Sequence, residues 1–365
     1  MKIIETKRAR KRHQLTYDGP PRVPEHLRIK TLPSLHRHLQ TAIELEHSTI
    51  PPYLTALYSI DEGTNQESAA ILRSVVMEEM LHLILAANVL NAVGGHPSVN
   101  HARFVPEYPT YLPHSDKSFL VNLQKFSPAA IDTFLQIERP KKPLAPPEAN
   151  DYATIGQFYE AIELALIELS AQGDIFTGDP KRQITPEYYY GGGGEVSPVG
   201  AGWGKPPLAS ALEALHEIVG QGEGVDYTIF DGDHEMFGQE IEVAHYFRFN
   251  QIHCGRYYTL KDTPRSGPTG RPLAVDYKAV HNTQENPKMS DYPRGSELWQ
   301  KSYAFNRAYR GLLDVLHDAL NGRPALLLES VPRMYDLKYL ATSLMQVPLP
   351  GTDKTAGPSF EFVAD

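Results

Sequence analysis

The sequence predicts an all-α fold built around a four-helix bundle, and three observations lead to this prediction. The run from 69 to 93 is apolar almost all round, which is typical of a buried helix. It carries Glu79 and His82, which are three residues apart and therefore share one helix face. Glu242 and His245 repeat this spacing late in the chain. Two Glu-x-x-His pairs on two helices, with one further Glu from each of two others, are the pattern by which a bundle holds two iron or manganese ions.

Burial strengthens the metal interpretation of the first pair. A carboxylate and an imidazole inside an apolar helix are costly unless something compensates them, and one metal ion compensates both. The chain has a single cysteine, Cys254, so intrachain disulfides and thiolate metal cages are excluded. Any metal ligands must therefore be oxygen and nitrogen atoms, which 15 histidines and 44 acidic residues can supply.

Composition narrows the class of protein. The 365 residues, 41% of them hydrophobic, suffice for one large domain or two ordinary ones. A net charge of -9 does not favour nucleic acid, and the short basic run at 7–13 is typical of a solvated arm. No apolar stretch reaches the roughly 18 residues that span a bilayer, and the N-terminus lacks a signal-peptide core. We therefore expect a soluble, cytoplasmic protein without membrane contact, with an N-terminal arm at 1–30 and one domain at 31–365.

The first two helices should form an antiparallel hairpin. Helical spacing runs from Leu35 to Ile60, with Ser34 as the expected N-cap and a kink expected at Pro51-Pro52. The turn at 61–65 leads into the second helix, which should end at Gly94-Gly95.

Glu46 lies 33 residues before Glu79, a separation that allows about four turns of helix on each side of a short loop. The two carboxylates would then meet at one level. Glu46 is preferred as the ligand because it shares a face with Ile43 and Ile50. The neighbouring pair of Glu44 and His47 leaves this choice open.

The rest of the chain alternates long connections with further helices. The proline-rich region at 96–150 is interpreted as an insertion that covers the bundle, with one short amphipathic piece near 127–137. The glycine run at 191–194 lacks the Lys-Ser/Thr of a phosphate-binding loop and is interpreted as a mobile loop. Further helices are expected at 154–170, 208–219 and 235–258, and at 296–320 and 324–345 within a C-terminal extension at about 290–350.

Five stretches of the sequence together form a specific combination, whereas Glu-x-x-His alone would be weak. These stretches are 45–54, 78–82, 221–224, 242–249 and 356–361. They resemble the bacterial ferritin-like family that includes the iminophenylpyruvate dimer synthases of violacein biosynthesis and the chromopyrrolate synthases. The resemblance implies a metal-binding, ferritin-like helical domain, often found in secondary metabolism, with an amino-acid-derived imine as one candidate substrate.

Two residues compete for the remaining carboxylate position. Glu223 lies 19 residues before Glu242 in a Gly-Glu-Gly setting that allows close backbone approach at a helix end. Glu160, at the start of its helix, is the rival, although an acidic residue there also suits the helix dipole. Tyr53 and Tyr246 are packing residues in the plainer interpretation and hydrogen-bond or redox partners of the ligands in the sharper one. Three further histidines are expected to form supporting or surface hydrogen bonds: His47, His216 and His253.

The functional hypothesis is a non-haem di-iron oxidase or oxygenase that activates dioxygen on a small organic substrate. Carboxylate-rich sites with two imidazoles suit iron, with manganese as the other option, and we expect two ions per chain. The expected ligands are Glu79 and Glu242 bridging, Glu46 and Glu223 at the outer positions, and one histidine for each ion. The alternative is an iron-binding ferroxidase or storage protein without an organic substrate. A scaffold with a structural site is a third hypothesis, and the sequence leaves a homo-oligomer open.

Overall fold

The computed structural model describes residues 23–113, 115, 117–140, 152, 154–189, 196–224, 228–232, 241 and 243–364. Most of the predicted arm, the glycine run at 191–194 and Glu242 lie outside these residues. Within them the ordered elements are helices, together with isolated β-bridges such as the one between Ile60 and Val280. The predicted all-α fold class is confirmed.

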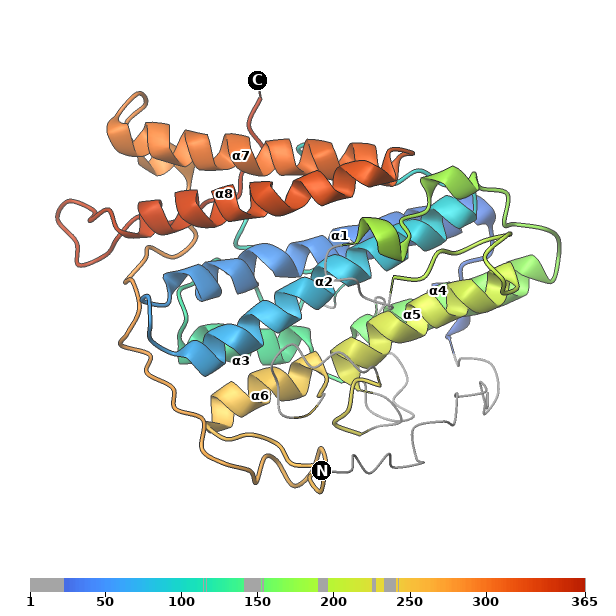
Figure 1. The fold of residues 1–365 in the computed structure, drawn as a ribbon, viewed down its shortest axis with the longest axis horizontal. Helices are drawn as coiled ribbons and strands as arrows, with labels where there is room; N and C mark the ends of the chain where they lie inside the picture. The colour runs from blue at the N-terminus through green and yellow to red at the C-terminus, as the bar shows by residue number, and fades with distance from the viewer. Residues whose placement is uncertain are drawn as a thin grey trace.

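Two long helices, α1 (Leu32–Ser59) and α2 (Gln66–Ala92), form the middle layer of the molecule (Figure 1). The N-cap of α1 is Thr31, whose side chain accepts the N–H of Ser34, so our prediction of Ser34 as the cap was wrong. The helix begins earlier because Pro33 fits its first turn, where no N–H donor is needed.

The two prolines inside α1 do not end the helix, which continues from Leu32 to Ser59. A proline lacks the N–H that would reach the carbonyl four residues before it, so Pro52 leaves the carbonyl of Ser48 without its helical partner. The buried Tyr108 hydroxyl donates to that carbonyl at 2.7 Å. A side chain from the proline-rich connection therefore satisfies the acceptor that the proline frees.

Four shorter helices form the layer below α1 and α2 (Figure 1). The helices α3 and α4 both pack against α1, whereas α5 and α6 both pack against α2. The helix α3 also contacts α6, and α4 contacts α5. Beside α1 and α2, the bundle therefore has two further rows, each made of two helices with a break between them. One row is α3 with α4, and the other is α5 with α6. The bounds are α3 (Pro128–Ile137), α4 (Ile155–Ser170), α5 (Pro207–Glu223) and α6 (His245–Cys254).

The element around the second Glu-x-x-His pair differs from our prediction of one helix over 235–258. The helix α6 begins at His245, and Ala244 before it has an extended backbone with ψ of 160°. The N–H of Ala244 donates to the carbonyl of Ile229 instead of continuing a helix. Val243 and Ala244 are therefore not helical, and the spacing of Glu242 and His245 does not lie on one helix. By contrast, α5 runs through Gly220 and Gly222 to Glu223, one turn beyond our prediction.

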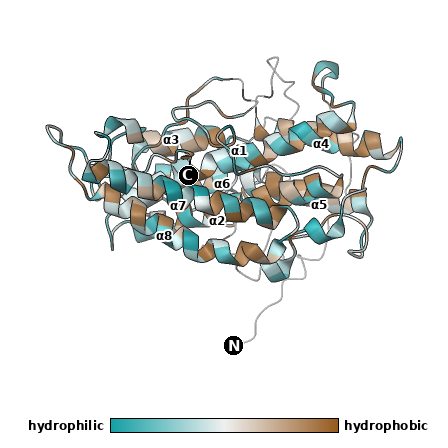
Figure 2. Cartoon of the chain, turned by 90° about the horizontal axis from the view of Figure 1, so that it is seen from above, coloured by the Kyte–Doolittle hydropathy of each residue, from teal (hydrophilic) through white to brown (hydrophobic). Residues whose placement is uncertain are grey.

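A helical hairpin of α7 (Glu297–Leu320) and α8 (Leu327–Met345) covers the opposite face of the α1–α2 layer (Figure 1). Figure 2 shows both hydrophilic and hydrophobic residues along these two helices, as expected for helices that pack against the protein on one side only. Short 3-10 helices occur at Glu25–Leu27, Pro180–Arg182, Pro186–Tyr188, Met289–Asp291 and Pro324–Leu326. Among the described residues, no helix is both long and apolar enough to cross a membrane.

Candidate metal centre

The side chain of His82 projects from α2 toward the layer formed by α3, α4, α5 and α6. Its Nδ1 atom lies 3.4 Å from Oε2 of Glu46 on α1 and 4.0 Å from Oε1 of Glu79, one turn earlier on α2. Its Nε2 atom is 2.7 Å from the side-chain oxygen of Gln221, near the end of α5. Because the amide oxygen can only accept, Nε2 donates to it, and Nδ1 is the ring nitrogen that faces the carboxylates. Burial alone would lower the pKa of His82, but Glu46 and Glu79 outweigh it and raise that pKa.

His245 takes the equivalent position from the first turn of α6. Its Nδ1 atom lies 2.9 Å from Oε1 of Glu79 and 3.6 Å from Oε2 of Glu138, the residue that caps the end of α3. Its Nε2 atom lies 2.9 Å from Oε2 of Glu78. The rings of His82 and His245 stack with centroids 5.3 Å apart. Both histidines thus turn the same ring atom, Nδ1, toward one group of carboxylates.

Glu79 lies between two matching pairs of side chains. One pair is Glu46 with His82, and the other is Glu138 with His245. All three carboxylates are buried and close enough to repel one another. Burial, followed by the charges of Glu138 and Glu46, raises the pKa of Glu79 to about 7. Such a cluster requires a compensating positive charge.

Hydroxyl groups hold each of the three carboxylates. Tyr159 donates to Oε1 of Glu46 and Tyr53 donates to Oε1 of Glu138, each at 2.5 Å. Thr49 donates to Oε2 of Glu79 at 2.7 Å. Burial, reinforced by the nearby carboxylates, raises the pKa of both tyrosines well above the usual value. Both phenols therefore stay protonated and act as hydrogen-bond donors.

A buried ion-pair network fixes the far side of His245. Arg248, one turn along α6, donates from Nη1 to Oε1 of Glu78 at 2.5 Å and from Nη2 to Asp231 at 2.7 Å. Burial alone would raise the pKa of Glu78, but Arg248 and His245 outweigh it and lower that pKa to about 2. Glu78 is therefore a carboxylate that accepts from Nε2 of His245, which leaves Nδ1 as the ring nitrogen that faces Glu79 and Glu138.

The donor set fits a metal ion that prefers oxygen and nitrogen. One ligand atom from each of Glu79, His82 and His245 lies within 4.8 Å of the others, and all three residues are buried. Nδ1 of His245 is buried without a hydrogen-bond partner among the described residues, although carboxylate oxygens surround it. Nδ1 of His245 lies 2.9 Å from Oε1 of Glu79 and 3.6 Å from Oε2 of Glu138, so one ion could bind all three atoms. Carboxylates with two imidazoles suit iron or manganese.

Four of the predicted site residues come together in this cluster: Glu46, Glu79, His82 and His245. Glu223, the last residue of α5, instead turns its carboxylate to the start of α4, where it accepts the N–H of Gly156 at 2.9 Å. Glu160 is half-buried on α4, and its neighbour Tyr159 is the residue that contacts Glu46.

Sequence reasoning missed Glu138 and Glu78. Glu138 falls inside the region interpreted as an insertion, directly after the one amphipathic piece found there, and that position was the available signal. Glu78 directly precedes Glu79, but sequence alone does not say which of two adjacent carboxylates faces which histidine.

Of the predicted supporting residues, Tyr53 contacts a cluster carboxylate, whereas Tyr246 is half-buried with its ring edge-on to Phe247. His216 and His253 are exposed, and their rings lie 3.3 Å and 3.1 Å from carboxylate oxygens of Glu163 and Asp132. His47 faces away from the cluster and bonds to Tyr309, as described below.

Comparisons with known proteins agree with this architecture. A family model described as ferritin-like matches residues 39–254. The chain is 25% identical to dichlorochromopyrrolate synthase from Lentzea aerocolonigenes over an alignment of 400 positions, gaps included, which covers 93% of this chain and 37% of that protein. It therefore spans little more than a third of this relative's length. The crystal structure of a ferritin-like protein from Caulobacter vibrioides superposes with a TM-score of 0.60 at 24% identity, covering 87% of this chain and 96% of that one.

Proposed function

Because the chain belongs to the ferritin-like family, we propose that it is an oxidoreductase that binds a pair of metal ions, iron before manganese, and oxidises a small organic substrate with dioxygen. One observation carries this proposal. The Nδ1 atoms of His82 and His245 converge on three buried carboxylates. Two imidazoles cannot balance three carboxylates, so the cluster carries excess negative charge. The relative's name, dichlorochromopyrrolate synthase, supports a small-molecule substrate.

We assign the ligands from the two matching pairs. Glu46 and His82 would hold one ion, Glu138 and His245 the other, and Glu79 lies where both can share it. Glu138 takes the outer position that we expected for Glu223. When bound, such ions would provide the place where dioxygen binds and is reduced.

The surrounding side chains position the ligands and exclude water. The hydroxyls of Thr49, Tyr53 and Tyr159 each donate to a ligand carboxylate, so each carboxylate is turned in one direction before any ion arrives. Gln221 orients the ring of His82, and Glu78 orients the ring of His245, each through a hydrogen bond to Nε2. Because the ligand side chains are buried, water does not compete for these contacts.

Metal content tests the proposal directly. The full-length protein, purified without chelators from iron-supplemented cells, should contain about two irons per chain by elemental analysis. The double variant Glu79→Ala, His82→Ala should contain almost none, whereas the control Glu160→Ala should match the parent. Folding of each variant is checked by circular dichroism. One metal or none in the parent, unchanged in the double variant, would contradict the assignment.

Oxygen consumption separates the proposed enzyme from a ferroxidase. In a ferroxidase, ferrous iron alone drives oxygen uptake in proportion to the iron added. In the proposed enzyme, uptake continues over many turnovers only with an organic reductant, and an amino-acid-derived imine is the first substrate to test. Uptake that stops once the iron is oxidised, across a broad substrate screen, would favour the ferroxidase.

A further inference from the structure

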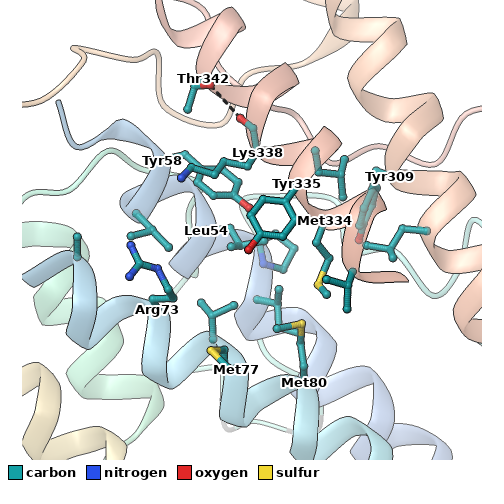
Figure 3. A pocket seen from close by; sticks show the side chains of 18 of the residues that line it. Leu54, Tyr58, Arg73, Met77, Met80, Tyr309, Met334, Tyr335, Lys338 and Thr342 are labelled. Carbon is teal, nitrogen blue, oxygen red and sulfur yellow. Dashed lines mark hydrogen bonds between the residues drawn. The ribbon is translucent and has the colours of Figure 1, made fainter. Parts of the chain in front are cut away.

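A cavity of about 830 Å³ lies on the face of α1 and α2 that turns away from the candidate metal centre. Its other wall is the hairpin of α7 and α8 (Figure 3). The lining stripe of α2 includes Arg73, Met77 and Met80, whereas Glu78, Glu79 and His82 belong to the opposite stripe. None of the carboxylates or histidines of the cluster lines this cavity, so it is a separate site.

The body of the cavity is apolar and adaptable. Leu54 of α1, Met77 and Met80 of α2, and Met334 of α8 point into it from three helices (Figure 3). Methionine side chains are unbranched and polarizable, so they adjust to ligands of different shape. The volume falls within the roughly 300–1,000 Å³ typical of small-molecule sites. The lining therefore suits a largely hydrophobic small molecule.

Two cations lie at one end. Arg73 on α2 and Lys338 on α8 both line the cavity, and neither forms an ion pair with any other described residue. Figure 3 shows Lys338 reaching across Tyr58, with its amine on the same side of the cavity as the Arg73 guanidinium. A cation from each wall makes this end a site for a carboxylate.

Two acidic residues also belong to the described lining of the cavity. Asp61 lies 3.8 Å from the ring of His281. Glu62 is the other, and both belong to the turn between α1 and α2, about two turns of helix before Arg73.

A second polar anchor lies further along the cavity. The buried His47 bonds through Nε2 to the hydroxyl of Tyr309 at 2.6 Å, and both residues line the cavity. Nδ1 of His47 is buried and has no hydrogen-bond partner among the described residues. His47 is level with Met80, seven residues beyond Arg73 on α2, so the two polar ends are about 10 Å apart.

We propose that this cavity binds an organic acid with an elongated apolar body, its carboxylate between Arg73 and Lys338 and its far end beside His47 and Tyr309. The body can be an aliphatic chain or an aromatic system, because both satisfy the same lining. This site is independent of the proposed metal chemistry and goes beyond it.

Isothermal titration of the full-length protein tests the proposal with two probes, dodecanoate for an aliphatic acid and biphenyl-4-carboxylate for an aromatic one. We expect saturable binding of at least one probe at one site per chain. The double variant Arg73→Glu, Lys338→Glu should weaken that binding at least tenfold, whereas Arg103→Glu, an exposed charge change outside the cavity, should not. Dodecanol, the uncharged analogue, should bind the parent and the double variant alike.

A cavity-filling variant locates the bound probe. Met334→Trp should abolish binding because the indole occupies the space of the apolar body. Metal content of the charge variant should equal that of the parent, so failure of the metal assignment and failure of this site give different results. Absence of saturable binding by both acids, or binding that both sets of variants leave unchanged, would overturn the proposal.

Discussion

The Tyr53 hydroxyl on α1 donates a hydrogen bond of 2.5 Å to the carboxylate of Glu138, at the end of α3. Tyr159 on α4 makes the same contact with Glu46 on α1. The candidate centre is therefore arranged as two halves, each with a carboxylate, a histidine and a tyrosine donor, on either side of Glu79. Each half can be tested separately.

Glu138→Gln should remove the ion held by one half only. The amide keeps the volume of the carboxylate but loses its charge, so we expect metal content to fall from about two ions to about one per chain. Elemental analysis measures this, with Glu160→Gln as the matched control on α4. A variant that retains both ions would exclude Glu138 as a ligand.

Removal of the tyrosine donors should weaken metal binding without abolishing it. Tyr53→Phe and Tyr159→Phe each leave a ligand carboxylate without its hydrogen bond, and such losses typically cost about 10–100-fold in metal affinity. Competition with a chelator of known affinity measures the change. Tyr246→Phe removes a hydroxyl from a half-buried tyrosine near His245 and should bind metal like the parent. Equal affinity in all three variants would show that the two hydrogen bonds do not support the ligands.

Arg248→Met should strongly destabilise the protein. The substitution removes the guanidinium that bonds to the buried carboxylates of Glu78 and Asp231, and breaking such a pair costs about 3–5 kcal/mol. Urea unfolding of metal-free protein measures the loss. The double variant Arg248→Met, Glu78→Gln removes one orphaned charge and should recover part of that stability. A double variant no more stable than the single one would argue against the pairing as the cause.

Gly156→Ala should destabilise the start of α4. An added Cβ would lie 2.6 Å from Oε1 of Glu223, the buried carboxylate that accepts the Gly156 N–H. We expect a loss of about 1–3 kcal/mol from this overpacking. Gly173→Ala is the control, because its Cβ would meet nothing within 4 Å. Thermal unfolding compares the two, and equal midpoints would mean that Glu223 moves aside without cost.

The sequence by itself determined the helical class and half of the candidate site. The apolar run at 69–93 can only be a buried helix, and its two polar groups, Glu79 and His82, need compensation wherever the fold places them. The spacing from Glu46 to Glu79 likewise predicts that the two carboxylates lie at one level when their helices pair around a short loop. These are local consequences of helix periodicity, which depend little on the rest of the chain.

Only the tertiary structure decided the other half. Glu138 lies in a proline-rich connection, and nothing in its local sequence says that α3 aligns with α4 to form one broken row of the bundle. His245 reaches the cluster from the first turn of a helix rather than from its middle, so the periodicity expected for Glu242 and His245 did not apply. The contacts that bring Glu138 and His245 to Glu79 join residues far apart in the chain. Packing of the layers selects such contacts, and sequence spacing carries no record of them.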